Sequence, residues 1–138
     1  MMKKFAAALI LTLSAATAAL AANYIEPQEL KELLNKKQSV ILVDIQPAAD
    51  FEKQHLPGSI ETNAFPAKSD DEKKRLDKTL PIINASKDPV VVICPRGKTG
   101  AKNSYEYLMK QGVAEERMTI LEGGIHEWPY KELFVKGR

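Results

Sequence analysis

The chain has 138 residues, of which 44% are hydrophobic and 28% are charged, with a formal net charge of +2 and a single cysteine. This composition is typical of one soluble globular domain, and it excludes collagen-like, coiled-coil and disordered chains. One cysteine also excludes an intramolecular disulfide, so the fold must be stabilised by a packed core.

The N-terminus has the three-part pattern of a secretory signal peptide. Lys3 and Lys4 precede an apolar run over residues 5–13, and small residues follow it. Alanines at both positions that a signal peptidase reads predict cleavage after Ala21. Residues 1–21 are therefore expected to be removed, and the protein is expected to be periplasmic. The alternatives are an uncleaved membrane anchor and a buried helix. Cleavage would reduce the 20 basic residues to 18, equal to the 18 acidic ones. A net charge of zero argues against nucleic-acid and membrane partners.

The rest of the chain alternates between helix-like and strand-like segments. In chain order, the pattern predicts a helix over 26–36, a strand over 40–45, helices over 48–54 and 70–79, a strand over 90–93, a helix over 100–111, a strand over 118–121 and a helical stretch over 125–134. Pro81 is expected to end the helix over 70–79. Alternating strands and helices predict an α/β fold with a largely parallel central sheet, covered by helices on both faces. One domain is expected over residues 23–138.

Cys94 follows the apolar run over residues 90–93 and precedes a loop and a helix. Ligands of parallel sheets bind at the carboxyl ends of the strands, so the thiol is expected at a binding site. Loop N–H groups, the helix dipole and the cations of Arg96 and Lys98 are expected to lower the pKa of Cys94 and to attract anions. The alternatives are a small buried hydrophobic residue and an intermolecular disulfide.

The loop length argues against two other chemistries. Tyrosine phosphatases clamp phosphate with an arginine six residues after the cysteine, where this chain has Gly100. The second cysteine of a redox Cys-x-x-Cys pair is absent, because that position holds Gly97. No metal site is expected, since His55 and His126 are far from Cys94 in the sequence; His55 is expected to make a structural hydrogen bond and His126 to lie at the surface.

Four segments, in order, resemble motifs of the rhodanese sulfurtransferase family. They are Leu42-Val43-Asp44-Ile45-Gln46 with Asp50-Phe51, the segment His55-Leu56-Pro57-Gly58-Ser59-Ile60, the loop from Cys94 to Ala101, and Leu121-Glu122-Gly123-Gly124 followed by Trp128. The resemblance implies a rhodanese-like α/β fold with a mostly parallel, five-stranded sheet and helices on both faces. It is closest to exported single-domain members.

The resemblance also implies a mechanism in which Cys94 attacks a sulfane-sulfur donor and becomes a persulfide, with no other cofactor. Arg96, Gly97, Lys98, Thr99 and Gly100 would bind small anionic sulfur compounds. The cation two residues after the cysteine is nearer to the thiosulfate pattern than to the mercaptopyruvate pattern, and polysulfide would fit equally. The acceptor would be a thiol or another protein.

Two further interpretations stay open at this point. One is a low-turnover module that carries sulfane sulfur to a partner enzyme, and the other is a scaffold whose Cys94 only forms an intermolecular disulfide. A monomer and a homodimer are equally compatible with a site built from one loop.

The sequence departs from the family pattern beside the predicted site. Where the family usually has an arginine and, four residues later, a glutamate, this chain has Gln46 and Asp50. A hydrogen bond between these two side chains is expected to replace the salt bridge, with a small structural effect. Asp44 is expected either to orient the active-site loop or to cap a turn.

Overall fold

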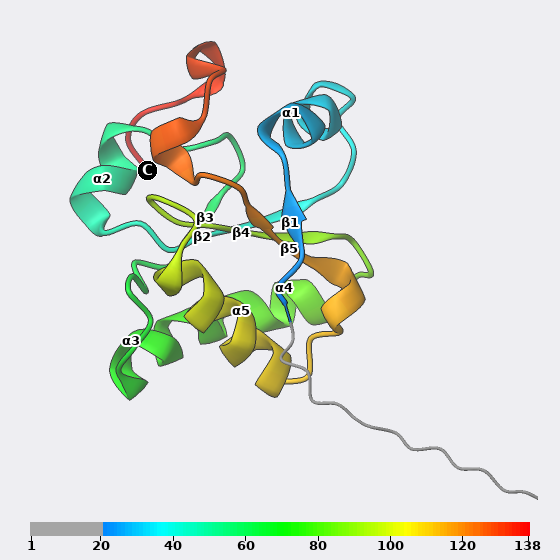
Figure 1. Ribbon diagram of the computed structural model, residues 1–138, viewed down its shortest axis with the longest axis vertical. Coiled ribbons are helices and arrows are strands. Elements are labelled where there is room, and N and C mark those ends of the chain that lie inside the picture. The colour runs from blue at the N-terminus through cyan, green and yellow to red at the C-terminus, as the bar shows by residue number, and fades with distance from the viewer. Residues whose placement is uncertain (1–20) are drawn as a thin grey trace, which may run out of the picture.

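The computed structural model describes residues 21–138, so the predicted signal peptide lies outside the described residues except for Ala21. Within these residues, five strands form one sheet in the order β1-β5-β4-β2-β3. Every neighbouring pair is parallel, and Figure 1 shows the strands crossing the middle of the molecule. Their bounds are β1 Tyr24–Ile25, β2 Ile41–Asp44, β3 Ile60–Glu61, β4 Val90–Ile93 and β5 Met118–Leu121. The predicted α/β class with a five-stranded sheet is confirmed.

The two central strands determine where the site lies. β2 and β4 are built of aliphatic residues, apart from Asp44, and every residue in them is buried. Branched aliphatic side chains suit a strand that packs against helices on both faces. The register pairs Asp44 with Ile93, so both strands end at the same level of the sheet and Cys94 follows directly.

Helices cover both faces of this sheet, as expected (Figure 1). On one face, α1 (Pro27–Asn35) contributes Leu30 to a core that also contains Trp128. On the other face, α4 (Leu80–Asn84) and α5 (Thr99–Lys110) contribute Ile83, Tyr105 and Leu108. The remaining helices are α2 (Ala48–Lys53) and α3 (Asp70–Lys74). None of the helices within residues 21–138 combines the length and the apolar character that crossing a bilayer requires.

Two of the expected helices are wrong in detail. The segment expected as one helix over 70–79 divides into α3 and a 3-10 turn over Arg75–Thr79 that leads into α4. Pro81 does not end a helix but lies in the first turn of α4. A backbone N–H in the first turn has no partner within the helix, so proline costs no hydrogen bond there. The stretch expected over 125–134 forms two 3-10 turns, Ile125–Glu127 and Lys131–Leu133, because Pro129 interrupts the backbone hydrogen bonds between them.

Candidate active site

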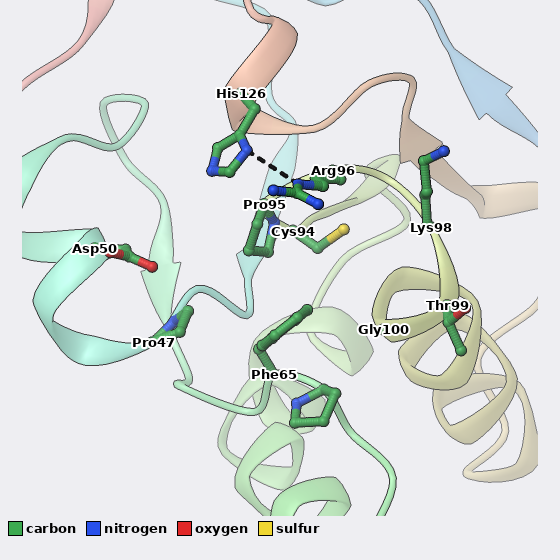
Figure 2. Close-up of a pocket in the computed structure, with 11 residues that line it drawn as sticks. Pro47, Asp50, Phe65, Cys94, Pro95, Arg96, Lys98, Thr99, Gly100 and His126 are labelled. Carbon is green, nitrogen blue, oxygen red and sulfur yellow. Dashed lines mark hydrogen bonds between the residues drawn. The ribbon is translucent and has the colours of Figure 1, made fainter.

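A pocket of about 420 Å³ opens at the carboxyl ends of β2 and β4. The loop between β4 and α5 forms one side of it, with Cys94, Pro95, Arg96, Lys98, Thr99 and Gly100. Figure 2 shows Phe65 facing this loop from below, while His126 lies above it at the rim. The pocket therefore has an apolar wall opposite a wall that carries two exposed cations.

The predicted site residues lie together, although Gly97 plays a different part from the others. Five of them line the pocket, whereas Gly97, which belongs to the same loop, is buried and does not line it. The backbone N–H of Gly97 donates a hydrogen bond to the Sγ atom of Cys94 at 2.7 Å. Its φ of +71° is a conformation that favours glycine, and this conformation turns the amide toward the sulfur.

The electrostatics of Cys94 differ from the expectation. Only 1% of the residue is exposed, and this burial raises the pKa of the thiol above its ordinary value of 9.0. The amides of Gly97, Arg96, Lys98 and Ala101 act in the opposite direction, but burial has the larger effect. The predicted lowering of the Cys94 pKa is wrong, because the side chains of Arg96 and Lys98 are exposed, where solvent screens their charges.

The segment after β5 holds the active-site loop in place. The N–H of Ile125 donates to the carbonyl of Cys94 at 3.0 Å, and the N–H of His126 donates to the carbonyl of Pro95 at 2.9 Å. Gly124, with φ +63°, allows the two backbones to approach so closely. These two hydrogen bonds fix the start of the loop, and the N–H groups of Arg96 and Gly97 that follow act on the sulfur of Cys94.

Gln46 does not make the expected hydrogen bond to Asp50. Its Nε2 donates instead to Asp44 Oδ2 at 3.0 Å and to the carbonyl of Gln54 at 3.1 Å. Asp44 Oδ1 accepts from the N–H of Gln46 at 2.8 Å, so Asp44 caps the turn after β2. The Asp50 carboxylate lines the pocket and has no hydrogen bond or ion pair to a side chain within residues 21–138.

The two histidines have different positions. His55 Nδ1 lies 2.8 Å from the carbonyl of Phe51, and the two rings stack, so His55 has the expected structural role. His126 is exposed, as expected, but it also lines the pocket, and its Nδ1 accepts a hydrogen bond from Arg96 Nε at 3.3 Å. His126 is not among the residues predicted for the site from the sequence. Between Ala21 and Arg138 no three His, Cys, Asp or Glu residues cluster in a way that could hold a metal ion.

Fold and site together define a parallel α/β domain whose only cysteine lies at the end of a central strand, inside a loop of inward-facing amides. Residues 26–131 match the rhodanese-like domain family, and the chain belongs to this family. The resemblance found in its four motifs is thereby confirmed.

Two curated relatives are sulfurtransferases by name. The chain is 27% identical over 115 residues to the thiosulfate sulfurtransferase GlpE of Pseudomonas savastanoi. This alignment covers 82% of this chain and 94% of the relative. It is 30% identical over 106 residues to the adenylyltransferase and sulfurtransferase MOCS3 of Aedes aegypti, and this alignment covers 75% of this chain. This chain spans only 23% of the mosquito protein.

Among solved structures, a yeast protein tyrosine phosphatase of the rhodanese family superimposes with a TM-score of 0.65. The alignment covers 88% of this chain and 96% of the yeast chain, at 16% sequence identity. Similarity at this level of identity supports the fold alone.

Proposed function

We propose that the protein is a sulfurtransferase that moves sulfane sulfur from thiosulfate or polysulfide to a thiophilic acceptor through a persulfide on Cys94. The observation that carries the proposal is the Gly97 amide bonded to the Cys94 sulfur at the base of a pocket with a cationic rim. Family membership and the two sulfurtransferase relatives support it. The pattern of residues 1–21 supports a periplasmic location.

In the first step, the Cys94 thiolate attacks the outer sulfur of thiosulfate. A new S–S bond forms while the bond to the sulfonate sulfur breaks, and sulfite leaves with the electron pair. The outer sulfur of the persulfide then carries the negative charge. The N–H of Gly97, which donates to Sγ of Cys94, and the neighbouring loop amides lie close to the place where this charge develops and would stabilise it.

In the second step, an acceptor thiolate or cyanide attacks the outer sulfur of the persulfide. The S–S bond to Cys94 breaks, the acceptor leaves with the sulfur, and the Cys94 thiolate is regenerated. Neither displacement itself transfers a proton, but the Cys94 thiol must first release its proton to solvent, because burial raises its pKa.

Phosphate-ester chemistry fits the pocket less well. Gly100 occupies the position of the clamping arginine, and a Cβ atom there would lie 2.9 Å from Cδ1 of Phe65. A larger side chain therefore has no room at position 100 unless Phe65 moves. The loop therefore lacks an arginine at the position that clamps a phosphate dianion in tyrosine phosphatases, although it keeps the amides that a thiolate requires.

A slower role as a sulfur carrier is the second candidate, and the raised pKa of Cys94 favours it. Burial reduces the fraction of thiolate at neutral pH, which slows attack on a donor. A buried persulfide is also protected from solvent, which suits storage and delivery to a partner. Formation of the persulfide without release of thiocyanate from cyanide would distinguish carriage from turnover.

Incubation with thiosulfate or with polysulfide, followed by intact mass spectrometry, tests the proposal. The protein should gain one sulfur atom, about 32 Da, or a small multiple of it, and cyanide should remove the gain. The Cys94→Ser variant should gain nothing. A wild-type protein that stays unmodified with both donors would exclude the Cys94 persulfide.

The Asp50 carboxylate, which has no side-chain partner within residues 21–138, predicts a gain of function when its charge is removed. Asp50→Asn removes a negative charge from the wall of a pocket that receives dianions, so the KM for thiosulfate should fall about two- to fivefold with kcat little changed. The effect should diminish at high salt, because Asp50 is only half-buried. Steady-state kinetics at two ionic strengths measure it, with Asp77→Asn, outside the pocket, as the matched control. A KM equal to that of the control would contradict the prediction.

A further inference from the structure

Arg96 has a single side-chain partner within residues 21–138, and that partner is His126. Arg96 Nε donates to Nδ1 of the imidazole at 3.3 Å, and no carboxylate of the described chain pairs with the guanidinium. Figure 2 shows this hydrogen bond spanning the rim of the pocket above Cys94. The two partners are 30 positions apart in the chain, and the segment between them includes all of α5 and β5.

The imidazole is fixed at this place by its own backbone. The N–H of His126 donates to the carbonyl of Pro95 at 2.9 Å, next to Arg96 in the chain. A ring nitrogen that accepts from a guanidinium carries no proton, so the proton of the neutral imidazole is on Nε2. The hydrogen bond occupies Nε of Arg96 and leaves the N–H groups of both Nη atoms available.

We propose that His126 is a positioning residue, which orders the Arg96 guanidinium at the mouth of the pocket so that its Nη groups meet the sulfonate of a dianionic donor. This inference rests on the proposed function for the identity of the donor. An exposed arginine samples many rotamers, and it loses that freedom when it binds an anion. An arginine that is already held by His126 loses less, so the donor binds more tightly.

A double-mutant cycle tests the coupling between the two residues. All variants carry Cys94→Ser, so that thiosulfate binds without reacting, and calorimetry measures its Kd. His126→Leu should raise the Kd about three- to tenfold when Arg96 is present and less than about twofold when Arg96→Ala is also present. His126→Gln keeps an acceptor oxygen and should bind thiosulfate more tightly than His126→Leu.

Gln111→Leu is the matched control, since it also replaces an exposed polar side chain by leucine, beyond the far end of α5. Its Kd should equal that of the parent. Equal losses from His126→Leu with and without Arg96 would overturn the inference, as would equal Kd values for His126→Gln and His126→Leu. This cycle measures binding without sulfur transfer, so its outcome is separate from that of the persulfide experiment.

Discussion

Gly124→Ala is expected to reduce sulfur transfer by at least about 100-fold and to lower the free energy of unfolding by about 2–4 kcal/mol. The residue has a φ of +63°, and a Cβ atom there would meet backbone on the active-site loop. It would contact the carbonyl oxygen of Cys94 and lie 2.6 Å from the N atom of Arg96. Backbone atoms cannot turn aside as a flexible side chain can. The loop must therefore shift, and the amides that face the sulfur shift with it.

Gly112→Ala is the matched control, because it introduces backbone strain without a clash. Gly112 also has a positive φ, +100°, but within residues 21–138 no atom outside its immediate chain neighbours lies within 4 Å of the position of its Cβ atom. Its substitution should lower the free energy of unfolding by about 1 kcal/mol and leave sulfur transfer intact. Denaturant unfolding and kcat/KM for thiosulfate measure both variants. Similar activity in the two variants would mean that the contact between Gly124 and the loop does not control the site.

The second large effect is a loss of stability as the pH rises, and it comes from Asp44. The residue is 0% exposed, and burial raises the pKa of its carboxyl from 3.8 to about 7. Hydrogen bonds from the backbone and side chain of Gln46 oppose this shift, and the negative charge of Glu61 adds to it. The folded protein thus keeps a proton on Asp44 that the unfolded chain has already released.

Stability from this group is fully present below about pH 4 and is lost as the pH rises to about 7. Three pKa units correspond to about 4 kcal/mol, which is the upper limit of the loss. Asp44→Asn removes the titration, so its free energy of unfolding should decrease less than that of the wild type over this range. Urea unfolding between about pH 4.5 and 8 measures the difference. Asp70→Asn, at an exposed position in α3, should follow the wild-type curve, and parallel curves for Asp44→Asn would contradict the prediction.

The centre of the sheet could be predicted from the residues, whereas its edges could not. Runs such as Val90–Ile93 have no alternation between polar and apolar residues, which is typical of a strand buried on both faces. β1 and β3 contain two residues each, too few to show a period, and only the family resemblance implied five strands. The 3-10 turns after β5 were also missed, because the helical spacing of their apolar residues does not reveal an interruption at Pro129.

Of the site, only the part that is contiguous in the chain could be predicted from the sequence. The loop from Cys94 to Gly100 is contiguous, so its position at a strand end followed from the order of the residues. Phe65 and His126 reach the pocket from segments about 30 residues away on either side, and nothing in their local sequence indicates this. The pKa of Cys94 depends on how deeply the thiol is buried, and the cationic neighbours in the sequence do not indicate this depth.

The parallel pairing of β1 with β5 has a consequence for how the chain folds. Tyr24 pairs with Ile120, 96 positions later in the chain, and β5 is the one neighbour of β1 in the sheet that residues 21–138 form. Contacts of such long sequence separation form late. β1 therefore joins the sheet only after the two ends of the domain have come together, and the active-site loop, which the segment after β5 holds, is among the last parts to become ordered.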